Sequence, residues 1–397
     1  MKKILLPILL VVLCSLTLAQ TKVEVKAQIR PRLEVDGKDF NSDTDASTFT
    51  AMRTRLGVKF TNGNIIGFIQ AQDTRIWGTE PSTLSSTSNL DLHQAYVIIK
   101  GLGCGKWDVK IGRMEAAYGP QRLVGSVGWH NVGRSFDGAV LKLNGCKFSF
   151  DLFGYQEVEN MAFGDNTDQY FAGFYGNWAV SKKYKIQPFV LWERAIQKTL
   201  SRFTTGLYVK GKAGALSHEL EFAYQAGDNN GLDVSAMMAA ANFNFTFKGK
   251  AKPTLSAGID YLTGDDNPGD DEYKVFSTLY ATNHKYYGFM DYFLNIPTHT
   301  MGLGLTDIHG KFSVMPSKKL ALKAAFHVFS STEDYTLNSG STSNSFGSEL
   351  DITCVYKYNK NLTVQGGFSF FNPGDIFEET KGKDNAYWAY LMTVVNF

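Results

Sequence analysis

Alternation of apolar and polar residues with a period of two is the feature that most limits what this chain can form. The first such segment, residues 22–35, reads KVEVKAQIRPRLEV, with apolar residues on one face and mostly charged residues on the other. This pattern predicts a β-strand with two unlike faces. Strands of soluble sandwiches alternate too, but they are usually only about 5–6 residues long. The length of this segment therefore favours a strand that crosses a membrane.

Similar segments follow along the whole chain. They predict about 18 strands at roughly 21 residues per strand and connection, which is the spacing of an outer-membrane barrel. A count of 16 is the alternative, because strand ends read from a sequence are uncertain by about 2–4 residues. The predicted strands after the first are residues 48–60, 64–76, 91–100, 107–118, 135–144, 147–157, 168–179, 184–194, 201–211, 215–226, 234–247, 252–263, 302–314, 319–330, 346–358, 361–371 and 386–397.

The connections between these strands alternate in length. Every second one is a short turn, as in TNGN at 61–64 and NKN at 359–361, whereas most of the others are longer. Bacterial barrels place short turns on the periplasmic rim and long loops on the exterior rim. Because both chain ends fall on the short-turn side, the strand count is even. The longer loops are residues 36–47, 77–90, 119–134, 264–301, 331–345 and 372–385.

Residues 1–19 predict a signal peptide that is removed from the mature chain, residues 20–397. A basic start precedes an apolar run and a small residue suited to cleavage. A membrane anchor is the alternative reading. Pro7 and Ser15 interrupt the run, however, and a spanning helix needs about 20 apolar residues. We therefore expect an exported protein.

The formal charge of the whole chain is +2, and removal of Lys2 and Lys3 leaves the mature chain nearly neutral. A neutral exported chain gives no reason to expect nucleic-acid binding. Later segments lack the ~18 unbroken apolar residues of a spanning helix, so a membrane form must be a closed β-barrel without free strand edges. The sequence predicts one all-β domain, a transmembrane antiparallel β-barrel in the lipid of a bacterial outer membrane.

Arginine is concentrated in the first half of the chain, because all ten arginines lie at or before Arg202. A charge that faces lipid at mid-membrane costs about 2–4 kcal/mol, so we expect strand arginines to face the lumen. Guanidinium groups in an aqueous channel select for anions. The alternative is that they pair with lumenal carboxylates, Asp73 among them, and only brace the wall. The first strands supply Arg30, Arg32, Arg53, Arg55 and Arg75.

One oversized connection, Gly112 to Asp137, carries charges and several glycines. Loops of this length inside a run of hairpins are usually functional. We expect it to fold into the lumen and to bring Arg113, Arg122 and Arg134 toward the pore axis. Glu115 and Asp137 are the expected counter-charges.

Cysteine, metal and catalytic signals are weak. Cys104 and Cys146 fall in two short turns of the same rim and are candidates for a disulfide, which would leave Cys354 free. No Cys-x-x-Cys or His-x-x-x-His spacing occurs, and the seven histidines form no local catalytic group, so we predict no enzyme, no cofactor and no resident metal. A solvated acidic loop tip is favoured over a weak calcium site at Asp265, Asp266, Asp270 and Asp271.

Several stretches resemble the alginate export family of outer-membrane proteins. The specific ones are GRMEAAYGPQRLVGSVGWHNVGRSFDG at 112–138 and NHKYYGFMD at 283–291, and RTRLG, QDTRIWG and DYLTGDD add to them. The resemblance implies a monomeric barrel with an arginine-lined constriction that passes an anionic polyuronate. It carries that lumenal role to Arg30, Arg32, Arg53, Arg55, Arg75, Arg113, Arg122 and Arg134.

We therefore expect a passive channel for anionic solutes or acidic polysaccharide. A general porin for small solutes is one alternative, and a barrel that anchors a secretion or adhesion complex is another. The chain ends YWAYLMTVVNF, and its terminal Phe397 resembles the signal that the outer-membrane assembly machinery reads.

Overall fold

The computed structural model describes residues 21–83, 89–161 and 167–397; the predicted signal peptide lies outside the described residues. Antiparallel strands dominate the described chain. They are β1 Lys22–Gly37, β2 Ser47–Asn62, β3 Ile65–Ile76, β4 Leu90–Gly101, β5 Trp107–Met114, β6 Phe136–Leu143, β7 Phe148–Val158, β8 Gln169–Ala179, β9 Tyr184–Ala195, β10 Leu200–Ala213, β11 Leu216–Asn229, β12 Leu232–Thr246, β13 Thr254–Leu262, β14 Glu272–Tyr273, β15 Leu305–Val314, β16 Leu320–Thr336, β17 Thr342–Lys357, β18 Leu362–Pro373 and β19 Ala386–Asn396.

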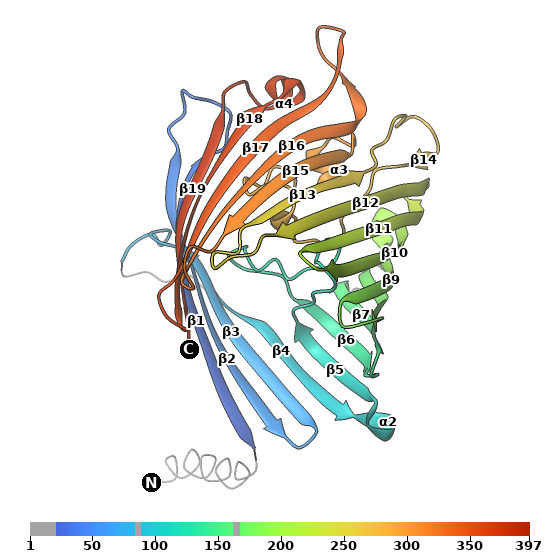
Figure 1. Ribbon diagram of the computed structural model, residues 1–397. Helices are drawn as coiled ribbons and strands as arrows, with labels where there is room; N and C mark the ends of the chain where they lie inside the picture. Colours follow the sequence, from blue (N-terminus) through green and yellow to red (C-terminus); the bar gives the residue numbers. More distant parts are fainter. Residues whose placement is uncertain (1–20, 84–88, 162–166) are drawn as a thin grey trace.

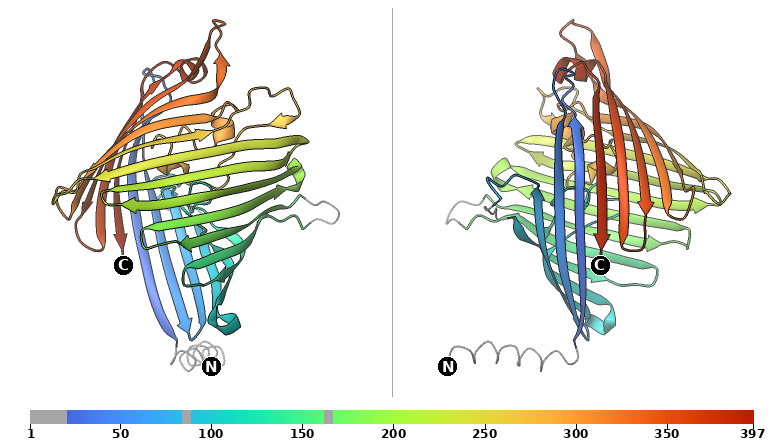
Figure 2. Two further views of the ribbon diagram at one scale, coloured as in Figure 1. Left: turned by 45° about the vertical axis from the view of Figure 1, so that its right-hand side comes forward. Right: turned by 90° about the vertical axis from the view of Figure 1, so that its left-hand side faces the viewer.

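The described strands close into one barrel. Consecutive strands pair antiparallel around the wall, β13 pairs with β15, and β1 closes the circle against β19. Of the nineteen strands in the sheet, β14 has two residues and runs parallel beside β12, which leaves eighteen in the wall. The prediction of an 18-stranded antiparallel barrel is confirmed. β1 begins and β19 ends toward the rim that carries the short turns (Figures 1 and 2).

The two faces of the first strand follow the predicted alternation. Val23, Val25 and Leu33 are exposed on the outer face, whereas Arg30 and Arg32 are buried on the inner face. Because directly paired residues of neighbouring strands point to the same side, the register extends this assignment around the barrel. Arg30 lies opposite Arg53, for example, so both side chains face the lumen.

Helices within the described residues are few and short. They are α2 Leu102–Gly105, α3 Ile296–His299, α4 Asp375–Thr380 and the 3-10 turns η2 Ile196–Lys198 and η3 Asn283–Lys285. Within the described ranges, no helix is both long and apolar enough to cross a membrane. α3 and η3 belong to a long segment between β14 and β15, and α4 lies in the connection from β18 to β19.

The prediction of a Cys104–Cys146 disulfide is wrong, because Cys104, Cys146 and Cys354 are all free and exposed. The two cysteines lie in neighbouring hairpin turns, β4–β5 and β6–β7. Turn centres two strand spacings apart are separated by about 10 Å. A disulfide needs Cα atoms about 4.4–6.8 Å apart, so adjacency of the turns does not bring the thiols together.

Candidate functional site

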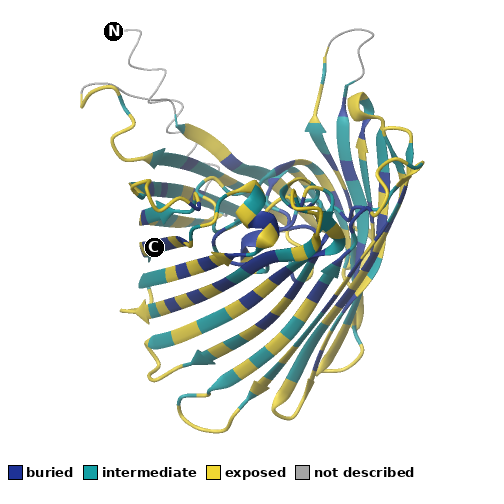
Figure 3. Ribbon diagram, turned by 90° about the horizontal axis from the view of Figure 1, so that it is seen from above, coloured by how far each residue is buried: buried dark blue, intermediate teal, exposed yellow. Residues whose placement is uncertain are grey.

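Two connections from the exterior rim turn inward and cross the lumen, as the view from above shows (Figure 3). One is the 115–135 loop, between β5 and β6, and the other is the 274–304 loop, between β14 and β15. A parallel bridge joins Val124 to Tyr280. Tyr280 donates its backbone N–H to Leu123, and Gly125 donates to Tyr280 in turn, at 2.9 and 2.8 Å. The two loops therefore form one inner layer, and the prediction that the first folds inward is confirmed.

Four inward-facing arginines of β1 and β2, the arginine wall, hold the 115–135 loop by its carbonyl oxygens. Arg30 donates to Gly128 at 2.8 Å and to His130 at 3.1 Å. Arg32 donates to Trp129 at 2.8 Å. The other two members, Arg53 and Arg55, donate at 3.0–3.2 Å to Gly128, His130 and Val132. These carbonyls are neutral acceptors, but Arg32 also pairs with Glu34 at 2.7 Å and Arg55 with Glu115 at 3.1 Å. Arg30 and Arg53 form no ion pair with a described residue, so their bonds fix the loop without neutralising their charges.

Trp129 is the apolar contact of this loop with the wall. Its ring stacks on His284 of the 274–304 loop, with centroids 4.6 Å apart, and meets Tyr390 of β19 edge-on at 4.9 Å. The Arg32 guanidinium lies 4.4 Å from the ring centre, a cation–π distance. The Trp129 indole of the 115–135 loop therefore contacts both the barrel wall and the 274–304 loop.

Glu115 begins the loop and ties it to the wall. Its carboxylate accepts from Arg55 at 3.1 Å and lies 2.7 Å from His93 Nε2. Burial favours the protonated carboxyl, but the bond to His93 and the charge of Arg55 outweigh it and hold the pKa of Glu115 below its ordinary value. Glu115 is therefore the counter-charge that the sequence analysis expected.

Two further arginines are carried by the loop itself. Arg122 is buried; it pairs with Asp260 of β13 and, at 3.2 Å, with Glu221 of β11, and it stacks 3.9 Å from the centre of the Tyr286 ring. Arg134 donates to the carbonyls of Gly125, Tyr280 and Ala281, which lie on the two loops. Both arginines lie in the lumen, but their donors are engaged by protein groups.

Two of the predicted lumenal arginines face outward instead. Arg75 lies opposite Met52, and Arg113 lies opposite Ala95, on the face away from Arg53 and Met114. Each has its expected counter-charge beside it, Asp73 at 2.6 Å and Asp137 at 2.7 Å, so these carboxylates face outward too. The lumenal placement was wrong because Arg75 and Arg113 sit at exterior strand ends, where an outward charge costs only about 0–1 kcal/mol.

A lysine-rich recess under the 274–304 loop was not predicted. It encloses about 280 Å³, and its lining includes Lys285 of the loop, Lys311 of β15 and Lys323 of β16. None of these three lysines forms an ion pair with a described residue, and Lys285 donates only to the Pro120 carbonyl, at 3.1 Å. Burial lowers the pKa of Lys285. The lysines were missed because they are dispersed in sequence and only the register gathers them.

A second recess lies under the start of the 115–135 loop and also encloses about 280 Å³. Lys110 of β5 lies 3.9 Å from the centre of the Tyr96 ring, whereas Lys142 of β6 pairs with Asp151 at 3.3 Å. Lys100 and Lys110 form no ion pair among the described residues. The accessible cations on the periplasmic side of the loops are thus mainly lysines, not arginines.

The acidic segment after β13 contains its own cation. Lys274 pairs with Asp266 at 2.7 Å and with Asp270 at 3.5 Å. Asp265 accepts backbone N–H groups of the same segment, at 3.2 and 3.4 Å. The four carboxylates of the weak calcium candidate, Asp271 included, do not form a group whose ligand atoms lie close enough together to share one metal ion. In the described chain, the group that does is Asp307, His309 and His327.

The closed barrel and its inward loops define the class of the protein, a porin-like outer-membrane channel. A family model described as alginate export matches residues 22–390, so the chain belongs to the alginate export family. No curated protein sequence matches it.

Solved porins share the fold. OccAB4 of Acinetobacter baumannii has a TM-score of 0.65 at 12% identity, with 96% of this chain and 99% of that chain covered. OccK11 (OpdR) of Pseudomonas aeruginosa has a TM-score of 0.63 at 12% identity, covering 94% and 96%. OpdK of Pseudomonas aeruginosa, solved with vanillate, has a TM-score of 0.61 at 11% identity, covering 94% and 98%. At these identities the likeness establishes the fold alone.

Proposed function

We propose that this protein is a passive channel of the Gram-negative outer membrane that favours small anionic solutes, carboxylates and acidic sugars among them. The recess lined by Lys285, Lys311 and Lys323 carries the proposal, because three ammonium groups that form no ion pair with a described residue outnumber the one carboxyl group of the lining, Asp351. Channels conduct when such sites bind weakly and in series. Arg30 and Arg53 add positive charge beside the 115–135 loop, since their bonds go to neutral oxygens.

Size favours small solutes over a long polymer. Two connected loops cross the lumen: Arg30, Arg32 and Arg122 fasten the first to the wall, Arg134 joins the two loops, and Met290 of the second donates its backbone N–H to Glu349 of β17. Vanillate, found with OpdK, is itself a small carboxylate. The substrate class we propose is therefore a monomeric or short acidic solute, with the arginines as positioning groups and the lysines as solute contacts.

General diffusion is the second candidate. It is favoured by the bonding of all four wall arginines to the loop and by the pairing of Arg32 with Glu34, which is the carboxylate bracing that the sequence analysis kept as the alternative. A channel of this kind would pass small solutes of either charge at similar rates.

We further propose that the barrel is a monomer and that the assembly machinery reads its last strand. Phe397 is exposed and forms two backbone hydrogen bonds with Ala27 of β1, at 2.9 and 3.3 Å. The proposal is supported by this position of Phe397, where the first and last strands meet.

Planar-bilayer recording in a potassium chloride gradient tests the two candidates. We expect a reversal potential with the sign of chloride selectivity, and a shift toward zero in the double variant Lys311→Gln, Lys323→Gln. Lys250→Gln, in the periplasmic turn before β13, removes a lysine outside the recess and should leave the potential unchanged. Equal permeability of both ions would support general diffusion instead, and cation preference would contradict the anion proposal.

A further inference from the structure

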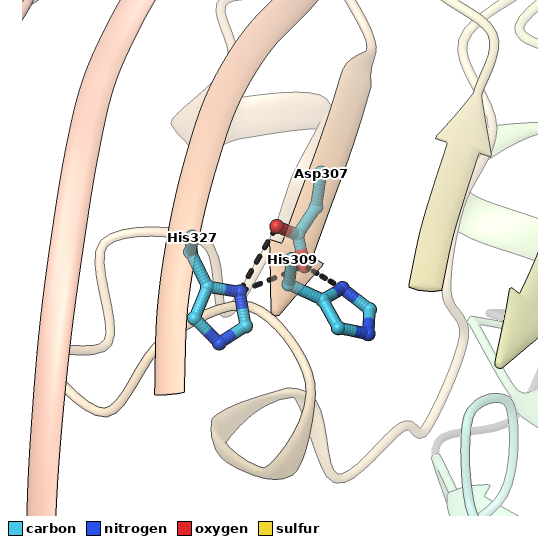
Figure 4. A group of neighbouring side chains, drawn as sticks. All are labelled: Asp307, His309 and His327. Carbon is cyan, nitrogen blue, oxygen red and sulfur yellow. Dashed lines mark hydrogen bonds and ion pairs between the residues drawn. The ribbon is translucent and has the colours of Figure 1, made fainter. Parts of the chain in front are cut away.

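Three buried side chains meet on the lumenal face of β15 and β16 (Figure 4). Asp307 and His309 are two residues apart on β15, so they share its inner face, and His327 lies directly opposite His309 on β16. The Asp307 carboxylate lies 3.1 Å from His309 Nδ1 and 2.9 and 3.0 Å from His327 Nδ1. Register alone therefore brings two imidazoles to one carboxylate.

The spacing of these atoms suits a metal ion. One ligand atom from each residue lies within 4.8 Å of the other two. Ligands bound to one zinc ion at about 2.0–2.1 Å lie roughly 3 Å apart around it. Two histidine nitrogens and one carboxylate oxygen form a common donor set for zinc and related transition metals, whereas calcium and magnesium take oxygen ligands.

The second ring nitrogen of His309, on the side away from Asp307, contacts a side-chain amide. Its Nε2 lies 2.7 Å from the Asn242 side-chain oxygen on β12, and that oxygen can only accept. A neutral His309 with its proton on Nε2 would donate to Asn242 and present the Nδ1 lone pair toward Asp307. A cation between them would relieve that contact. A metal-binding histidine usually donates its other N–H in this way to an oxygen of the surrounding shell.

Neighbouring strands add buried carboxyl groups to this region. Asp260 lies opposite Asp307, and Glu349 lies opposite His327. Asp260, Glu349 and Asp351 are buried; the carboxyl groups of Glu349 and Asp351 interact with each other, whereas one Asp260 oxygen has no hydrogen-bond partner among the described residues. Arg122 pairs with Asp260, but no described lysine or arginine forms an ion pair with Asp307, Glu349 or Asp351. Unpartnered buried carboxylate oxygens are costly, so this region is suited to an added cation.

We propose that Asp307, His309 and His327 bind a divalent transition-metal ion of the zinc class inside the barrel. The ion would be held by one Asp307 oxygen and the two Nδ1 atoms, and Asp260 is the nearest source of a further oxygen across the β13–β15 pair. It would join β15 to β16 beside the recess that His327 also lines. The proposal is independent of the solute that the channel passes.

Equilibrium dialysis of the refolded full-length mature barrel in detergent against zinc chloride measures this directly. We expect one zinc ion per barrel in the wild type. Asp307→Asn and His327→Gln should each weaken binding by at least the roughly 10–100-fold that follows loss of a supporting metal-site residue. His218→Ala is the control, since His218 of β11 hydrogen-bonds no described carboxylate.

Heat-modifiable migration in gels checks that each variant is folded, so that loss of zinc is not loss of the barrel. Absence of stoichiometric zinc in the folded wild type would overturn the proposal. Unchanged affinity in folded Asp307→Asn would overturn it as well. Zinc-edge X-ray absorption gives a second readout, in which two imidazole ligands are expected, and a spectrum with oxygen ligands alone would contradict the assignment.

Discussion

The two sides of the lumen use charge differently. On the arginine wall of β1 and β2, the cations donate to backbone carbonyls of the 115–135 loop. A second set of buried acids, Asp260, Asp307, Glu349 and Asp351, which we term the carboxylate wall, lies on β13, β15 and β17; Glu349 and Asp351 interact with each other, and one Asp260 oxygen has no partner among the described residues. On the first side, backbone carbonyls hold most of the guanidinium donors. On the second, carboxyl groups are held by each other, by histidines and by Arg122.

The 115–135 loop connects these two sides. It offers neutral carbonyls to the arginine wall and a cation, Arg122, to the carboxylate wall. The difference shows that a buried charge can be held either by polar groups that leave its sign in place or by an opposite charge that cancels it. Loss of an ion pair should therefore lower the folding stability most at Arg122, which is paired with two buried carboxylates.

Replacement of Arg122 by Met is expected to have the largest effect. It removes the only side-chain cation bonded to Asp260 and Glu221 in the described chain and leaves two carboxylates buried. Breaking a buried pair in this way typically costs about 3–5 kcal/mol. Urea unfolding of the barrel in lipid vesicles measures the loss. Addition of Glu221→Gln and Asp260→Asn should recover most of the stability, and an unchanged unfolding free energy in Arg122→Met would refute the argument.

The double variant Arg30→Gln, Arg53→Gln should loosen the loop from the other side. Each hydrogen bond from a charged donor contributes about 1.5–3 kcal/mol, so the loop should leave its seat for part of the time. Single-channel conductance is expected to rise and to become noisier. Arg75→Gln with Arg113→Gln removes the same charge from the outer face and should change neither property. Equal effects from both pairs would mean that the wall arginines do not hold the loop.

Lowering the pH should weaken the contacts of Glu115 with Arg55 and His93. The pKa of Glu115 is lowered from 4.5 in the folded chain, so its stabilising contribution is complete above about pH 4.5 and disappears as the pH falls through the lower folded value. Conductance should stay constant from pH 7 to pH 5 and change only at lower pH. Glu115→Gln should show the acid-type conductance already at pH 7. A transition centred above pH 5 would point to another group.

The smallest effect is expected on the outer face. Asp137→Asn breaks the exposed pair with Arg113, and such pairs contribute about 0.2–1 kcal/mol. Ion selectivity should not change, because neither side chain faces the lumen. A selectivity shift as large as that of the recess lysines would contradict the assignment of the two faces.

The wall of this barrel was predictable from local sequence. A period of two and alternating connection lengths suffice for eighteen strands, and most predicted ends lie within a few residues of the observed ones. β5 is shorter than expected, since it ends at Met114 where the chain turns inward, and β16 continues to Thr336. The phase of the alternation could also have placed Arg113 outward, because it shares a face with Val109 and Ile111.

The interior was less predictable, because its contacts join residues far apart in sequence. Nothing local to Trp129 indicates that Arg32 and Tyr390 surround it. The candidate metal site was not predicted from the sequence, because the histidine and cysteine spacings that were tested are those of metal sites on helices and loops. The useful signal was Asp307-x-His309 on a strand, where residues two apart share a face, but His327 joins them only once β15 and β16 are in register.

The position of Trp129 has a consequence for barrel assembly. Its indole contacts Arg32 of the first strand and Trp388 and Tyr390 of the last. The first and last strands pair only when the barrel closes, so the contacts of the indole are complete only then. Contacts this remote in sequence form slowly. The place of Trp129 in the lumen is thus fixed in the final step of assembly.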